Sequence, residues 1–179
     1  MRRHVHRLDR ALTRRSFRAR SRRRDSALVA ITRAASYSRL WLLIAAGLAA
    51  TKSRQARRAA GRGVLAIAIA SAVANGPAKL LVRRRRPFSR ARPALIPVPR
   101  TTSFPSGHTA SAFAFATAAC GELPALAPAL VPLAVAIGYS RVYTGVHYPS
   151  DVAAGAALGV ACGVVALRMP PRGHTDADA

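Results

Sequence analysis

Three short polar segments, each at the end of an apolar stretch, hold the residue types in this sequence that could do chemistry. They are residues 79–87, 105–108 and 140–151. Together they supply fixed cations, a backbone amide beside a glycine at a helix start, and two histidines, one with a carboxylate nearby. Such groups bind a phosphate and stabilise its transfer. The remainder of the chain is interpreted as the scaffold that brings the three segments together.

The first segment provides two cations at helical spacing. Lys79 and Arg86 are seven residues apart, close to two turns, so on a continuous helix they share a face. Pro87 ends any helix there, which places Arg86 at the mouth of the preceding apolar segment. A lysine and a forked guanidinium that converge form a cradle for a dianionic phosphate. The alternative is an arginine run attracted to lipid headgroups, and residues 83–85 are assigned to that class.

The second segment, Pro105-Ser106-Gly107-His108, opens an apolar helix. Ser106 is a good N-cap residue, and Gly107 lets an anion approach the exposed amides of the first turn. His108 then points into the same space. The alternative is a helix cap followed by an incidental histidine.

The third segment adds Arg141 and a histidine with a carboxylate four residues later. Pro149 blocks a helix through His147, so the last helix is expected to begin near Pro149, with Asp151 in its first turn. His147 and Asp151 can then meet as an imidazole and its orienting carboxylate. Asp151 and Glu122 are the only acids between residues 26 and 175. Helix capping is the alternative, and it accounts for Asp151 but not for His147.

Charge and apolar content are separated along the chain. Of its 179 residues 51% are hydrophobic, yet the formal net charge is +23. Between the basic patches, residues 63–78 have no charge and residues 101–140 have only Glu122. This alternation is typical of a multi-pass membrane protein with basic loops. The basic patches are residues 1–24, 52–62 and 83–100.

The partners suggested by this charge are a bilayer and not nucleic acid. A nucleic-acid-binding chain is expected to interleave its cations with aromatic residues on a polar fold, and aromatic residues are only 6% here. A basic end beside apolar segments is typical of a surface rich in anionic lipid.

The pattern predicts an all-α, multi-pass membrane bundle of about five apolar helices, with the polar segments at helix ends. The membrane-embedded domain is placed at residues 36–168, with Tyr37 and Trp41 at the membrane interface. Residues 1–35 are predicted as a basic tail or an interfacial amphipathic helix, with residues 26–38 at the membrane surface, and residues 169–179 as a disordered tail. The alternative is a soluble helical bundle, because the segments are rich in alanine. The expected helices are 36–53, 63–82 with a kink at 75–77, 106–121, 123–139 and 149–167.

The motifs Lys-x6-Arg-Pro, Pro-Ser-Gly-His and Ser-Arg-x5-His-x3-Asp resemble the three signatures of the type 2 phosphatidic acid phosphatase superfamily. That group includes lipid phosphate phosphatases, undecaprenyl-diphosphate phosphatases and, more distantly, vanadium haloperoxidases. The stretch from Arg39 onward is also similar to the phosphatase half of bacterial proteins that fuse this domain to a lipid kinase.

The resemblance implies a role for each matching residue. His147 is the nucleophile that forms a phosphohistidine, Asp151 orients its ring, and His108 protonates the leaving group and then activates water. No metal or other cofactor is implied. The implied phosphate ligands are Lys79, Arg86, Ser106, Gly107 and Arg141.

The expected substrate is a lipid phosphate, with phosphatidic acid and polyprenyl phosphates or diphosphates as the candidates, and the expected location is a bacterial plasma membrane. The resemblance favours a site outside the cytoplasm, whereas the basic N-terminus favours the opposite side. The oligomeric state is left open. The alternative function is a non-catalytic membrane module that binds anionic lipid or a partner through its N-terminus. Deletion of residues 1–25 is expected to separate the two, because only the module depends on them.

Overall fold

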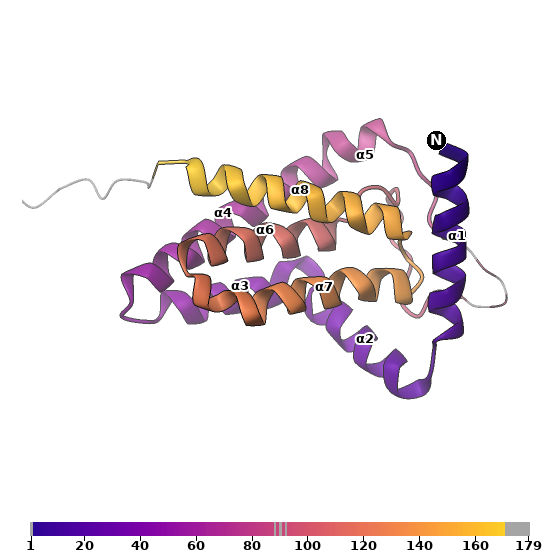
Figure 1. The fold of residues 1–179 in the computed structure, drawn as a ribbon, viewed down its shortest axis with the longest axis horizontal. Helices are drawn as coiled ribbons and strands as arrows, with labels where there is room; N and C mark the ends of the chain where they lie inside the picture. The colour runs from indigo at the N-terminus through magenta and orange to yellow at the C-terminus, as the bar shows by residue number, and fades with distance from the viewer. Residues whose placement is uncertain (1, 88, 90, 92, 171–179) are drawn as a thin grey trace, which may run out of the picture.

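The computed structural model describes residues 2–87, 89, 91 and 93–170. The described residues form helices and contain no strand, which confirms the predicted all-α class (Figure 1). Single 3-10 turns lie at Ser36–Ser38 and Pro124–Leu126. The helices are α1 (Arg2–Arg18), α2 (Arg22–Ala34), α3 (Arg39–Ala49), α4 (Arg54–Asn75), α5 (Pro77–Leu81), α6 (Gly107–Glu122), α7 (Ala127–Tyr143) and α8 (Pro149–Arg168).

Helix α6 lies at the centre of the bundle and contacts α4, α7 and α8. It is apolar all round and mostly buried, as expected for a helix enclosed by others. Glycines of α8 let the backbones of α6 and α8 approach closely. A Cβ added at Gly159 would lie 2.4 Å from the Ala110 carbonyl oxygen, and one at Gly155 would lie 2.6 Å from that of Ser106. Gly155 and Gly159 therefore allow the close packing of α6 against α8.

Three helical stretches are long and apolar enough to cross a membrane, namely Arg54–Leu81, Pro124–Tyr143 and Pro149–Arg168. Helices α2 and α3 pass the same test only as a pair, bent by 58°. The single helix predicted over 36–53 is therefore wrong. The chain turns at Tyr37 and Ser38, whose φ angles of 54° and 58° are left-handed and end the helix there.

The predicted kink before Lys79 is confirmed, because α4 ends at Asn75 and α5 begins at Pro77. Helix α5 then ends at Leu81, so Lys79 and Arg86 do not share a continuous helix. Arg86 reaches the site from the non-helical segment that follows.

One expectation for the N-terminal half is wrong. Trp41 does not lie at the membrane interface: it is fully buried, with its ring centroid 5.2 Å from that of Phe115. Gly63 makes room for this pair, since a Cβ there would lie 2.5 Å from the Phe115 ring. Helix α2 packs on α7 and buries Thr32, and its expected position at the membrane surface stays a prediction. Tyr37 is 84% exposed.

The two ends of the bundle differ. At one end Arg62 pairs with Glu122 at 3.2 Å and donates to the Ala166 carbonyl oxygen at 2.7 Å, which joins α4, α6 and α8. At the other end lie the three polar segments, and α1 crosses that end roughly perpendicular to α7 and α8 (Figure 1). The polar segments and the Glu122 turn therefore lie at opposite ends of the bundle. The predicted C-terminal tail lies outside the described residues from 171 on.

Candidate active site

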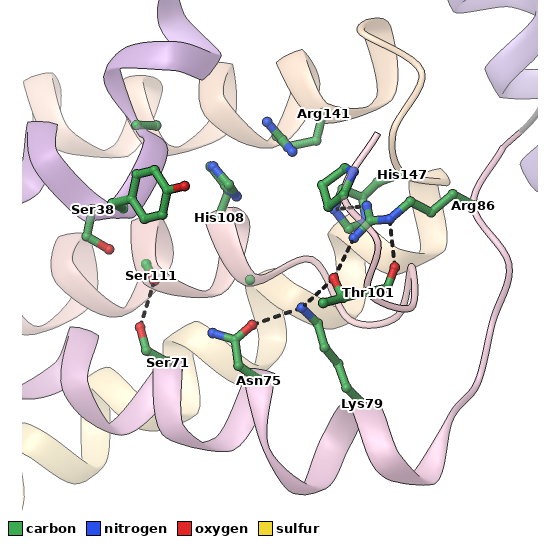
Figure 2. A pocket seen from close by; sticks show the side chains of 14 residues that line it. Ser38, Ser71, Asn75, Lys79, Arg86, Thr101, His108, Ser111, Arg141 and His147 are labelled. Atoms are coloured by element: carbon green, nitrogen blue, oxygen red, sulfur yellow. Dashed lines mark hydrogen bonds between the residues drawn. The ribbon is translucent and has the colours of Figure 1, made fainter. Parts of the chain in front are cut away.

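A cavity of about 220 Å³ lies at the end of the bundle where the three polar segments meet. Six of the eight site residues predicted from the sequence line it, and Ser106 and Asp151 lie behind its wall. Figure 2 shows side chains from α4, α5, α6 and α7 pointing into this space. The lining residues are Ala35, Tyr37, Ser38, Ser71, Asn75, Lys79, Arg86, Pro99, Thr101, Gly107, His108, Ser111, Arg141 and His147.

Thr101 holds two of the cations on one side of the cavity. Lys79 Nζ donates to Asn75 Oδ1 at 2.9 Å and to Thr101 Oγ1 at 3.3 Å. Arg86 donates from Nε to the Thr101 carbonyl oxygen at 3.0 Å and from Nη2 to Thr101 Oγ1 at 3.2 Å (Figure 2). A single threonine thus accepts hydrogen bonds from both the Lys79 ammonium and the Arg86 guanidinium and fixes their positions relative to each other. The motifs give no indication of Thr101 or Asn75, since neither falls within them.

The third cation, Arg141, is almost fully buried in the last turn of α7. Its Nη1 donates to Thr32 Oγ1 of α2 at 2.6 Å. Within the described part of the chain, none of Lys79, Arg86 and Arg141 has a carboxylate within 4.0 Å. Three positive charges therefore face one cavity without a counterion, an arrangement that favours an anionic ligand.

Three cavity-lining residues have a buried side-chain nitrogen with no hydrogen-bond partner among the residues that the structure describes. These nitrogens are Arg141 Nε, His108 Nε2 and His147 Nδ1. A buried donor without a partner costs about 1–3 kcal/mol. Arg141 Nε is such a donor, and because an anion in the cavity would accept from it, this atom favours the same class of ligand as the cations.

His147 lies between Arg86 and Asp151. Arg86 Nη1 is 3.0 Å from His147 Nε2, and because a guanidinium only donates, Nε2 must accept. The ring proton is then on Nδ1, which faces Asp151 Oδ2 at 3.7 Å. That distance is longer than a hydrogen bond, so the carboxylate acts on the ring through its charge. Nε2, the unprotonated nitrogen, is the one that faces the cavity cations.

Burial lowers the pKa of His147 to about 4, and Arg86 and Arg141 act in the same direction. Asp151 acts to raise the pKa of His147, but its effect is smaller than these lowering effects together. His147 is therefore neutral at pH 7, with a lone pair on Nε2.

Asp151 is fully buried behind His147 and is held by three other residues. Ser103 Oγ and the Tyr148 backbone amide donate to Oδ2, the latter at 2.9 Å, and Arg84 Nη1 donates to Oδ1 at 2.6 Å. The assignment of Arg84 to the lipid-headgroup class is therefore wrong. Its side chain is only 13% exposed and is paired with carboxylates on both sides.

Ser106 has a different local role from the one predicted. It is the residue before α6, but its hydroxyl makes no capping bond to the helix and instead accepts from Thr109 Oγ1 at 2.9 Å. Its backbone amide donates to the Asp151 carbonyl oxygen at 3.0 Å. Ser106 thus braces the start of α6 against α8, while Gly107 lines the cavity.

The fold and the site define the class of protein, which is a multi-pass membrane phosphatase. Comparison with known proteins supports this class. A sequence model described as PAP2 superfamily matches residues 60–174, and the chain belongs to that family. LpxE from Aquifex aeolicus is 28% identical, with a TM-score of 0.77 over 90% of this chain and 96% of that chain. A transmembrane PAP2 type phosphatidylglycerolphosphate phosphatase from Bacillus subtilis is 24% identical, with a TM-score of 0.73 over 90% and 84%, a likeness of fold. No curated protein sequence matches the chain.

Proposed function

We propose that this protein hydrolyses a lipid phosphate, either a monoester or a diphosphate, through a phosphohistidine intermediate. The observation that supports this most directly is the cavity that Lys79, Arg86 and Arg141 face without a carboxylate partner in the described residues. The Bacillus subtilis structure is of a phosphatase for a lipid phosphate, on the same fold.

In the first step His147 Nε2 attacks phosphorus, so that a P–N bond forms and the P–O bond to the lipid breaks. His108 gives a proton to the leaving oxygen. The phosphorylated imidazole retains the Nδ1 proton and is positively charged, and Asp151 at 3.7 Å stabilises that charge. In the second step water attacks phosphorus, His108 takes its proton, and the P–N bond breaks to release inorganic phosphate and neutral His147.

The non-bridging oxygens of the phosphate would be held by Lys79, Arg86, Arg141 and the Gly107 amide. The entering phosphate replaces the contact between Arg86 and His147 Nε2, which frees the lone pair for attack. We propose a metal-independent reaction, because the groups that face the cavity are cationic and repel a divalent ion while they supply the positive charge that the transition state needs.

Helix α1 supports a substrate at the membrane surface. Its outer face exposes Val5, Leu8 and Leu12, with Leu8 61% exposed, whereas its inner face buries Asp9 and Thr13. An apolar outer stripe flanked by arginines is typical of a helix that lies on a membrane interface. Because α1 crosses the end of the bundle that holds the cavity, the site would lie at headgroup level. Both solved relatives described above come from bacteria, and we place the protein in a bacterial plasma membrane.

The alternative of a non-catalytic module needs a different test from deletion of residues 1–25. Asp9 contacts Ser150 and Arg84 beside the site, so the deletion would disturb an enzyme as well. A single substitution inside the cavity separates the two functions.

The experiment measures phosphate release in detergent with EDTA from phosphatidic acid, phosphatidylglycerol phosphate, and undecaprenyl phosphate and diphosphate. We expect release by the wild type and none above background by His147→Ala. An acid-quenched reaction with a 32P-labelled substrate should label the wild type and not His147→Ala. His4→Ala, at an exposed histidine of α1, is the matched control and should behave as wild type. If no substrate yields phosphate, the proposed function is wrong and the membrane module is favoured.

A further inference from the structure

Asp9 is a nearly buried acid on the otherwise basic helix α1, with 3% of its surface exposed. Its Oδ1 accepts from the Ser150 backbone amide at 2.9 Å. Its Oδ2 accepts from Ser150 Oγ at 2.7 Å and from Arg84 Nη2 at 2.6 Å. A carboxylate from the first helix is thus fixed at the first turn of the last one, on Ser150, the residue directly before Asp151.

Arg84 joins Asp9 to Asp151. Its Nη2 donates to Asp9 and its Nη1 donates to Asp151 Oδ1, both at 2.6 Å, and its guanidinium lies over the Tyr148 ring at 4.2 Å. A planar guanidinium can hold two carboxylates at fixed angles, which a lysine cannot do. The carboxylates of Asp9 and Asp151 share the single positive charge of Arg84. The three side chains together therefore carry a net negative charge beside His147.

We propose that Asp9 is a positioning residue of the active site, which sets the orientation and charge of Asp151 through Arg84 and thereby fixes the Nδ1–H form of His147. The effect of Asp9 on catalysis rests on the function proposed above. The effect of Asp9 on the His147 ring does not depend on that function.

The geometry explains why Arg84 matters to Asp151. Ser103 and the Tyr148 amide both donate to Oδ2, whereas Arg84 donates to Oδ1. Oδ2 is also the oxygen that faces His147 Nδ1. Without Arg84 the carboxylate can rotate about its bond to Cβ. Without Asp9 the charge of Arg84 is neutralised by Asp151 alone, and less negative charge remains to stabilise a positively charged His147 ring.

The kinetic test uses Asp9→Asn, which keeps the size of the side chain and removes its charge. With phosphatidic acid in detergent micelles we expect kcat to fall about tenfold or more with KM little changed, because Asp9 does not touch the substrate. The double variant Asp9→Asn/Arg84→Gln should be no slower than Arg84→Gln alone, because Asp9 acts through Arg84. A kcat of Asp9→Asn near that of the wild type, or losses that multiply in the double variant, would overturn the proposal.

Asp25→Asn is the matched control. It removes another N-terminal carboxylate, which accepts from the Tyr143 hydroxyl at 2.8 Å, and should leave kcat close to that of the wild type. If Asp9→Asn does not fold, Arg84→Lys tests the same connection. A lysine ammonium cannot hold both carboxylates in the same geometry, so kcat should again fall about tenfold. An unchanged kcat in Arg84→Lys would overturn the proposal.

A measurement independent of turnover separates this inference from the proposed function. The chain has five histidines, so 15N-histidine spectra in detergent can be assigned by the loss of signals in His147→Gln. We expect Asp9→Asn and Arg84→Gln to shift the His147 ring nitrogens and Asp25→Asn to leave them in place. Unshifted signals in Asp9→Asn overturn the inference even if the wild type is active. If the wild type releases no phosphate but Asp9→Asn still shifts the His147 signals, the inference is supported and the proposed function is refuted.

Discussion

Arg86 Nη1 donates to His147 Nε2 at 3.0 Å, so the cation expected to bind phosphate covers the lone pair expected to attack it. The same guanidinium donates to the Thr101 and Thr102 carbonyl oxygens, which hold it at the rim of the cavity. A phosphate that enters between the two side chains would take over the Arg86 donor and leave Nε2 free. Under the proposed mechanism, His147 Nε2 would thus be free to attack only when an anion is present.

Arg86→Gln should therefore reduce kcat/KM strongly. It removes one of the charges that would hold the phosphate, and loss of one such donor costs about 10²- to 10³-fold. Initial rates of phosphate release from phosphatidic acid measure it. Arg85→Gln, at an exposed neighbour, is the control and should stay close to the wild type. An equal loss in both variants would mean that general positive charge, and not the position of Arg86, matters.

His147 should remain unprotonated to a lower pH than an exposed histidine, because its ring is buried. Because burial lowers the pKa of this imidazole to about 4, the ring stays neutral as the pH falls through the range where an exposed histidine gains a proton. Activity that needs the Nε2 lone pair is retained there and is lost as the pH falls through about 4. A 15N titration of the assigned His147 signals measures this directly. A midpoint near the ordinary histidine value of about 6.5 would contradict the prediction.

Gly159→Ala should weaken the contact between α6 and α8. The added Cβ would lie 2.4 Å from the Ala110 carbonyl oxygen, which is backbone and cannot move aside alone. Overpacking of this kind costs about 1–3 kcal/mol, and we expect a lower midpoint of thermal unfolding in detergent. Gly61→Ala is the control, since a Cβ there meets nothing within 4 Å. A midpoint for Gly159→Ala equal to that of Gly61→Ala would argue against such close packing.

Thr32→Val tests whether α2 contributes to the site. The substitution keeps the shape and removes the oxygen that accepts from Arg141 Nη1 at 2.6 Å. A buried guanidinium that loses its partner is less well fixed, and we expect kcat/KM for phosphatidic acid to fall about tenfold. Thr51→Val, at an exposed threonine, should have no effect. Wild-type activity of Thr32→Val would show that Arg141 does not need this contact.

The three motifs were sufficient to predict the class of fold and to locate the cavity, because each lies at a helix end where local rules are strong. Pro149 begins α8 and Pro77 begins α5, as expected from their fixed φ and missing amide. The failures concern contacts between distant segments. The aromatic character of Trp41 favours the membrane interface, but Gly63 opens a space in the core beside its partner Phe115.

Arg84 and Asp9 could not be paired from sequence, since they are 75 residues apart and each lies in a run of arginines. One signal was available. The chain has only six acids, and Asp9 is an isolated one in the most basic stretch of the sequence. Such an acid is costly to bury without a cation, so its presence indicates a specific partner.

The separation of the bundle into two different ends limits which lipids can react. The cavity and α1 lie at one end, and the contacts of Arg62 with Glu122 and with the Ala166 carbonyl oxygen close the other. With the function proposed here, only headgroups in the leaflet next to α1 can reach His147. Substrate made in the opposite leaflet must first cross the bilayer, so turnover in a sealed vesicle should stop once one monolayer is consumed.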